Sequence, residues 1–132
     1  MIRSGVDIVQ VKRIQKSIDE LGERFLNRIF TSTEREYSEG KKRKFEHFAA
    51  RFAAKEAFIK AIGGRYNIVN FNDVGVMNEI SGRPRLVIDP KITQKLQITE
   101  AHPIDVSLAH DETTAIAFVS IQNWQPPKNL EV

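Results

Sequence analysis

The sequence of 132 residues contains no cysteine. This absence excludes disulfides, thiolate zinc sites and thiol nucleophiles, and it fits a reducing compartment, so we expect a cytoplasmic protein. No apolar run approaches the roughly 20 residues that a membrane-spanning helix requires. The amino terminus MIRSGVDIVQVKR also lacks the uninterrupted apolar core of a signal peptide. We therefore expect a soluble protein with no membrane partner.

Most nucleotide-binding signatures are missing as well. The sequence has neither a Walker loop nor a glycine-rich dinucleotide fingerprint. His47, His102 and His110 lack the i, i+4 spacing of a helical metal site, so a transition metal is not expected. The length fits one domain with a core large enough to be stable without disulfides.

The charges are mixed rather than segregated by sign. Twenty basic residues are interspersed with 17 acidic ones, for a net charge of +3 and a pI near 9.3. This surplus favours polyanions in general and selects no particular partner. The run KKRK at residues 41–44 has three interpretations: a solvated helix start, a nuclear-import signal or a phosphate-binding patch.

Hydrophobic periodicity and turn residues divide the chain into expected elements. The β-branched stretch at residues 3–11 predicts a strand covered on both faces. Residues 14–29 predict an amphipathic helix with a weak point at Gly22, and a capping box at Thr31 or Thr33 starts a short helix that ends at Gly40. The remaining predictions are a long helix at 41–62 closed by Gly63-Gly64, two strands within 73–88, a helix from Asp89 to Leu96, and a hairpin of 104–111 with 113–122. We expect one domain over residues 1–122 and a flexible tail at 123–132.

Two charges interrupt the long helix. Its apolar positions fall on one stripe, and Glu56 and Lys60 project from the middle of that stripe. A buried charge costs several kcal/mol, roughly, unless it has a partner. The simplest explanation is an intrahelical pair, because the two residues are spaced i, i+4.

Asp7 is a second carboxylate in apolar surroundings, inside the first predicted strand. It could cap a neighbouring element through backbone N–H groups. If the fold instead brings Asp7 and Glu56 together, two like charges require a cation, and oxygen ligands favour Mg²⁺.

Two motifs carry a resemblance to a known family. GVDIVQVKRI, with its G-x-D, and RFAAKEAFIKAIG resemble the paired signature of the 4′-phosphopantetheinyl transferases, and residues 52–61 fill every specified position of the second motif. FTSTEREY, GRPRLVI and DVSLAHDETTAIAFV also occur where the small holo-acyl-carrier-protein synthase branch has them. The resemblance covers nearly the whole chain except the tail.

The resemblance implies transfer of the phosphopantetheine arm of coenzyme A to a serine of an apo acyl carrier protein, in support of fatty acid biosynthesis. Asp7 and Glu56 match the Mg²⁺ ligands, and Lys60 matches a lysine that stabilises charge on the leaving group. Glu56, a metal-bound water or His110 could accept the serine proton. The positions expected to bind coenzyme A, most of them as phosphate ligands, are Lys42, Arg43, Lys44, Arg51, Lys60 and Gly63.

The resemblance also implies an α+β fold, a small antiparallel β-sheet packed on a long α-helix, and a homotrimer with active sites at subunit interfaces. Arg13, Arg24 and Arg28 form one basic edge for carrier docking if the first helix stays regular past Gly22. Two departures stand out: Ala109 replaces a hydroxyl residue before His110, and acidic Glu20 and Glu23 lie in a helix that is basic in relatives.

Two other classes of protein compete with this hypothesis. A basic nucleic-acid-binding module would use KKRK and neighbouring arginines as its phosphate patch, but it leaves Asp7 and Glu56 unexplained. A catalytically silent structural subunit is the other. The discriminating property is dependence on coenzyme A and Mg²⁺, and we expect no nucleic-acid partner.

Overall fold

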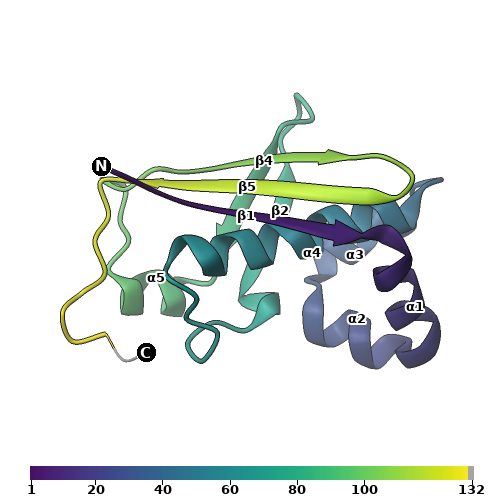
Figure 1. The fold of residues 1–132 in the computed structure, drawn as a ribbon, viewed down its shortest axis with the longest axis horizontal. Helices are drawn as coiled ribbons and strands as arrows, with labels where there is room; N and C mark the ends of the chain where they lie inside the picture. The colour runs from purple at the N-terminus through teal and green to yellow at the C-terminus, as the bar shows by residue number, and fades with distance from the viewer. Residues whose placement is uncertain (131–132) are drawn as a thin grey trace.

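In the computed structural model, which describes residues 1–130, two antiparallel sheets are arranged around a long helix (Figure 1). The elements in chain order are β1 (Ile2–Gln10), α1 (Val11–Leu21), α2 (Glu23–Ile29), α3 (Ser32–Glu39), α4 (Lys44–Ala61), the 3-10 turn η1 (Phe71–Asp73), β2 (Val74–Asn78), β3 (Pro84–Ile88), α5 (Pro90–Leu96), β4 (Ile104–His110) and β5 (Thr114–Gln122). Among these helices none is long and apolar enough to cross a bilayer. The predicted α+β class, with a sheet packed on a long helix, is confirmed.

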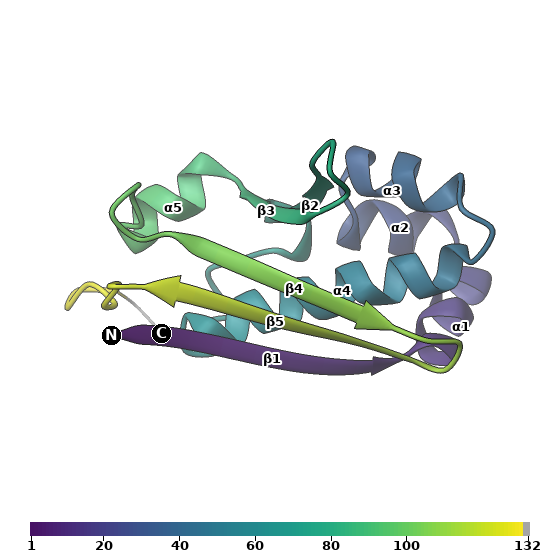
Figure 2. The same ribbon diagram turned by 90° about the horizontal axis from the view of Figure 1, so that it is seen from above.

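The larger sheet lies over α4, with β5 between β1 and β4 (Figure 2). Both strand pairs are antiparallel, and the register places Asp7 of β1 opposite Ala117 of β5, with Leu108 of β4 on the other side. Side chains alternate along each strand, so Val9, Ala117 and similar residues face α4 and are buried.

The expectation that the first strand is covered on both faces is wrong for this chain. Every second residue of β1 points away from α4, and Ile2, Val6 and Ile8 are exposed. Their neighbours across the sheet, Ile116 and Phe118 of β5, are exposed as well. The β-branched residues of this strand are therefore divided between one covered face and one open apolar face.

The long helix begins at Lys44, three residues later than predicted. Residues 41–43 form a turn instead, and Lys41 lies over the ring of Tyr37. A cluster of cations at a helix amino terminus opposes the helix dipole, which favours leaving these residues outside the helix. The other end agrees with the prediction: Gly63 and Gly64 have positive φ, and the N–H of Gly64 bonds the carbonyl of Ile59.

Gly22 divides the first predicted helix into α1 and α2. Its backbone has φ 57° and ψ −131°, a conformation that a residue with a side chain rarely adopts. The weak point expected at Gly22 is thus a full break, and the two helices diverge (Figure 1).

The other local signals are confirmed. Thr31 and Glu34 form the capping box of α3, so the first of the two candidate pairs is used. Asp89 caps α5, and Pro90 occupies its first position. Strands β2 and β3 form a hairpin, as do β4 and β5.

The tail is ordered further than predicted. Trp124 is 1% exposed, and its indole N–H donates to the carbonyl of Leu96 at 2.8 Å. The backbone N–H of Asn123 bonds the carbonyl of Met1. A flexible tail starting at residue 123 is therefore wrong for these first residues, because the indole fills the core beside α5; residues 131–132 of that tail lie outside the described residues.

One ion pair lies fully inside the core. Lys55 of α4 donates to Glu34 Oε1 at 2.6 Å and to the carbonyls of Phe71 and Val74. Glu34 also accepts from the backbone N–H of Val76 through Oε2 and from Thr31 through Oε1. Burial lowers the pKa of Lys55, and attraction to Glu34 opposes that shift. The pair ties α3, α4 and the β2 region together.

We predict that Lys55→Met lowers the free energy of unfolding by about 3–5 kcal/mol, because the carboxylate of Glu34 stays buried without its cation. Urea denaturation measures the change. Lys16→Met is the matched control, since the pair of Lys16 with Glu20 is exposed and its loss should cost less than about 1 kcal/mol. Equal midpoints for the two variants would contradict the assignment.

Candidate functional site

The strand β1 lies unusually close to α4 at Gly5. A Cβ atom on Gly5 would be 2.0 Å from the carbonyl oxygen of Ala57 and 2.7 Å from the backbone N of Ala61. Only glycine permits this contact, since any side chain would collide with helix backbone. The approach brings Asp7, two residues along β1, beside the exposed side of α4.

Asp7 meets the helix through Lys60. The ammonium of Lys60 donates to Asp7 Oδ1 at 3.0 Å and to the carbonyl of Val6 at 3.1 Å. The Lys60 side chain is 47% exposed, whereas that of Asp7 is 14% exposed. The ion pair is thus open to solvent on the lysine side, where an anionic ligand can reach it.

Glu56 is bound by a residue from the loop after α4. The hydroxyl of Tyr66 donates to Glu56 Oε2 at 2.6 Å. This hydrogen bond, together with partial burial and the nearby negative charge, raises the pKa of Tyr66 to about 12. Tyr66 therefore stays protonated at neutral pH and acts as the donor.

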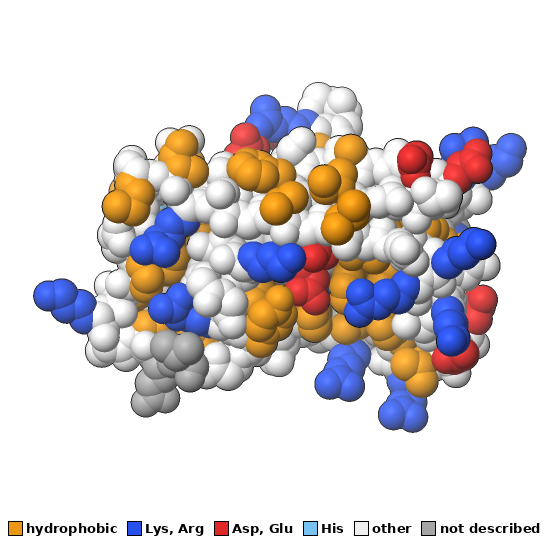
Figure 3. Space-filling model, in the orientation of Figure 1, with side chains coloured by type: hydrophobic (Ala, Val, Ile, Leu, Met, Phe, Trp, Pro, Cys, Tyr) orange, Lys and Arg blue, Asp and Glu red, His pale blue; other side chains and the backbone are white. Residues whose placement is uncertain are grey.

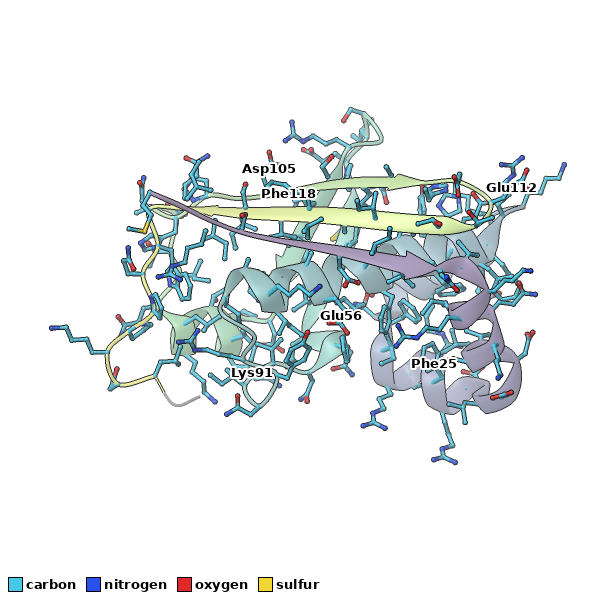
Figure 4. The ribbon with its side chains drawn as sticks, viewed as in Figure 1. Phe25, Glu56, Lys91, Asp105, Glu112 and Phe118 are labelled. Atoms are coloured by element: carbon cyan, nitrogen blue, oxygen red, sulfur yellow. The ribbon has the colours of Figure 1, made fainter. Side chains whose placement is uncertain are left out.

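The simplest explanation of Glu56 and Lys60, an intrahelical pair, does not describe their contacts. Within residues 1–130 neither side chain bonds the other; Lys60 bonds Asp7 and Glu56 bonds Tyr66. The helix itself is buried on nearly all sides, and these two residues lie on its open side rather than inside an apolar stripe. Figure 4 shows Glu56 in the carboxyl-terminal half of α4, beneath β1.

The site suits a hard cation that completes its ligands elsewhere. Asp7 and Glu56 supply carboxylate oxygens, the ligands that Mg²⁺ prefers. Across the described residues, no group of three or more His, Cys, Asp or Glu side chains could hold a metal ion alone. Two carboxylates plus water and substrate phosphates are a common magnesium environment, so the residues fit that ion.

The basic residues 42–44 lie at the amino end of α4. Arg43 lies 3.9 Å from Glu46 Oε2, and Lys44 pairs with Glu39 at 3.7 Å, while Lys42 is exposed. Glu46 also contacts His110 of β4, with 2.9 Å between its Oε1 and Nδ1. These residues form a patch at the amino end of α4.

Asp7 and Glu56 are called the acid pair below. His110 lies with the basic patch rather than with this acid pair. Strand β5 separates β4 from β1, so His110 is two strands away from β1. Along α4, Lys44 and Glu56 are about 18 Å apart at 1.5 Å per residue. The structure therefore brings Asp7, Glu56 and Lys60 together but holds His110, Lys42, Arg43 and Lys44 at a distance in the same chain.

Arg51, expected at the nucleotide phosphates, is only 2% exposed. Its guanidinium donates to Asn78 Oδ1 at 2.7 Å and lies over the ring of Tyr37. Burial lowers the pKa of Arg51. These contacts join α4 to α3 and β2, so in this chain the side chain supports the fold. Gly63, which was also expected to bind coenzyme A, lies beside Lys60 at the end of α4.

The three arginines expected to form a docking edge do not share one helix face. Arg13 belongs to α1, and its guanidinium lies 5.9 Å from the ring centre of Phe52. Arg24 and Arg28 belong to α2, beyond the break at Gly22. The expected single edge is wrong, because it required a regular helix.

Arg28 instead lines a cavity of about 470 Å³ between α2 and the loop that follows α4. Phe25 and Ile29 form the α2 wall, and Tyr66 and Phe71 form part of the other. On the face shown in Figure 3, acidic side chains near the centre lie among basic ones and are bordered by apolar side chains. The cavity and the acid pair share Tyr66, so the two features are adjacent.

Sequence reasoning missed Tyr66, Glu46 and the buried Lys55. Tyr66 follows the glycine pair in a loop, where no periodicity marks a functional side chain. Lys55 precedes Glu56 in the motif, and helical geometry turns the two about 100° apart, but the sequence does not show which of them is buried. Glu46 lies outside both motifs, and nothing in the sequence distinguished it from an ordinary helix carboxylate.

Two carboxylates with an adjacent lysine, and a separate basic patch on an α+β scaffold, are features suited to a phosphate-bearing ligand. Residues 3–119 match the family model of the 4′-phosphopantetheinyl transferase superfamily, and the chain belongs to that superfamily.

The similar proteins described here are all holo-[acyl-carrier-protein] synthases of this superfamily. A holo-[acyl-carrier-protein] synthase of Koribacter versatilis is 42% identical over 124 residues, covering 93% of this chain and 99% of that one. The crystal structure of the Neisseria meningitidis synthase has a TM-score of 0.82 at 32% identity, covering 93% and 100%. The Bacillus anthracis synthase, solved in complex with CoA (3′,5′-ADP), has a TM-score of 0.74 at 35% identity, covering 90% and 94%.

We predict that Gly5→Ala destabilises the chain by about 1–3 kcal/mol or more, because its Cβ would overlap the backbone of α4. Thermal unfolding measures the loss. Gly40→Ala is the control: its φ is −78°, its nearest neighbour would be 3.7 Å away, and its melting temperature should be nearly unchanged. A melting temperature for Gly5→Ala equal to that of Gly40→Ala would contradict the close approach.

Proposed function

We propose that this chain is a holo-[acyl-carrier-protein] synthase of the cytoplasm, which transfers the 4′-phosphopantetheine arm of coenzyme A to a serine of an apo acyl carrier protein. The observation that carries the proposal is the meeting of Asp7 and Lys60 at the close contact of β1 and α4, with Glu56 on the same open side. The relatives named above, at up to 42% identity, support it.

The chemistry is a displacement at phosphorus. A bond forms between the serine oxygen and the phosphorus that carries the arm, the bridging P–O bond to the nucleotide breaks, and its electron pair leaves with adenosine 3′,5′-bisphosphate. Such a reaction depends mainly on positioning and charge neutralisation. Bound Mg²⁺ would supply charge neutralisation at the pyrophosphate.

The residues of the site divide this work. Asp7 and Glu56 would hold the ion, and the exposed ammonium of Lys60 would donate to an oxygen of the leaving phosphate, where charge develops. The serine proton must go to a base within reach. Glu56 or a metal-bound water would be the acceptor in this chain, because His110 lies two strands away from β1.

The phosphates of the nucleotide half of coenzyme A would bind the basic patch. Lys42, Arg43 and Lys44 are the cations available for its phosphates, and Gly63 lies beside Lys60 without a side chain to obstruct a ligand. The patch and the acid pair are about 18 Å apart along α4. A homotrimer in which one chain supplies the patch and its neighbour supplies the acid pair would bring them together.

The open apolar face of the larger sheet supports this assembly. Val6 pairs with Phe118 and Ile8 with Ile116 across the register, and all four side chains are exposed. Contiguous exposed apolar residues of this kind mark protein interfaces. Figure 4 shows Phe118 on β5, away from α4.

The acyl carrier protein would dock beside the cavity of α2. Arg28 lines this cavity, and Tyr66 connects it to Glu56. A cation at this place can steer an acidic partner so that its serine approaches the acid pair.

The function is tested by incubating the chain with coenzyme A, Mg²⁺ and apo acyl carrier protein and detecting the added arm by mass spectrometry. We predict transfer by the native chain, none by Asp7→Ala or Glu56→Ala, and lowered turnover with little change in coenzyme A affinity for Lys60→Met. Absence of transfer with Mg²⁺-independent binding to DNA or RNA would favour the nucleic-acid module instead.

We predict that Arg28→Glu raises the KM for the carrier and leaves the KM for coenzyme A nearly unchanged, because Arg28 is proposed to touch only the carrier. Added salt should weaken the native encounter more than that of the variant. Lys95→Glu, at an exposed residue of α5 away from α2, is the control and should leave both KM values nearly unchanged. Similar losses for both substrates would remove α2 from the docking surface.

For the assembly, we predict that light scattering gives the mass of three chains for the native protein and a smaller mass for Phe118→Asp, which introduces a charge into the open face of the sheet. Ile80→Asp changes an exposed residue at the tip of the β2–β3 hairpin and should keep the native mass. A native mass of one chain would rule out shared sites.

A further inference from the structure

The loop between α4 and η1 sends one side chain back to the acid pair. Tyr66 follows Gly63 and Gly64, whose positive φ values turn the chain sharply, and its own backbone N–H bonds the carbonyl of Gly64. Arg65 contacts the carbonyl of Ile62 and so fastens the loop to the helix end. The turn that carries Tyr66 is therefore held in place by hydrogen bonds to the end of α4.

The two ends of this side chain meet different features. The ring lines the cavity with Phe25 and Arg28, and it is 49% exposed. The hydroxyl lies 2.6 Å from Glu56 Oε2. Within residues 1–130, Oε1 of Glu56 has no hydrogen-bond donor, so one carboxylate oxygen is engaged and the other is available to a ligand.

A glutamate side chain has several rotatable bonds, and an ion that binds it must first immobilise it. A hydrogen bond from outside the ligand set removes part of that cost by fixing the carboxylate beforehand. Among the described residues, the phenol of Tyr66 is the group that donates a hydrogen bond to Glu56, so it is the group that can do so.

We propose that Tyr66 is a positioning residue for the metal site: its hydroxyl holds Oε2 of Glu56 so that Oε1 is presented to a divalent cation shared with Asp7. The inference rests on the proposed function, since it assumes that the acid pair binds Mg²⁺. It adds a donor from outside the two sequence motifs. Loss of such a bond typically weakens metal affinity about 10- to 100-fold.

The test measures metal binding directly in the full chain. Free Mn²⁺, used as the probe, is counted by electron paramagnetic resonance in the presence of coenzyme A and without carrier protein. Tyr66→Phe removes the hydroxyl and keeps the ring, and it should raise the Kd for Mn²⁺ about 10-fold with an unchanged melting temperature. Tyr37→Phe, at the only other tyrosine, should leave the Kd unchanged.

Steady-state kinetics give a second readout. For Tyr66→Phe, the Mg²⁺ concentration at half-maximal rate should rise about 10-fold, while turnover at saturating Mg²⁺ returns to within about 2-fold of the native value. A merely structural loop residue would lower stability or turnover without this recovery.

The failures can be told apart. An unchanged Kd for Tyr66→Phe, in a chain that binds Mn²⁺ and loses it on Asp7→Ala, would overturn the role of Tyr66 alone. A lower Kd would show that the hydroxyl competes with the metal, which also overturns it. A native chain that binds no Mn²⁺ would overturn both this role and the proposed function.

Discussion

The contact of Gly5 with the backbone of Ala57 and Ala61 is the constraint on which the candidate site depends. A strand and a helix normally keep the distance that their side chains require, but here one strand position has none. Because the strand alternates faces, Asp7 also points toward α4, two residues beyond the contact. The helix then supplies Lys60 to Asp7 within hydrogen-bond distance, with Glu56 one turn earlier. In the G-x-D motif, the glycine thus permits the close packing, and the aspartate is the candidate ligand that this packing brings to α4.

The helix itself carries two kinds of charge in adjacent positions. Lys55 points into the core, where Glu34 and backbone carbonyls satisfy its ammonium. Glu56, turned about 100° away, points to the open side. A fully satisfied buried pair fixes the rotation of α4 against α3 and β2, and that rotation decides where Glu56 lies. The stability of the core and the geometry of the site are therefore linked through one dipeptide.

The two polar clusters of this small domain lie at opposite ends of α4. Arg43, Glu46 and His110 form contacts at the amino end of α4, and the acid pair lies near its other end. The larger sheet covers α4 with one face, and its opposite face is apolar and exposed. The two polar clusters and the exposed apolar face are the features from which the interfacial sites of the proposed homotrimer are inferred.

The sequence by itself determined the elements and most of the chemistry. Local signals sufficed for a capping box at the start of α3, the cap at Asp89 and the end of α4, because each depends on neighbouring residues; at Gly22 they indicated a weak point, and the structure has a full break. The motifs also pointed to Asp7, Glu56 and Lys60, which the fold places on the same side of α4. Only the tertiary structure decided what touches what: Lys60 bonds Asp7 rather than Glu56, Arg51 is buried, Trp124 belongs to the core, and Tyr66 reaches Glu56. These outcomes depend on distances between segments far apart in the chain, which periodicity and propensity do not encode.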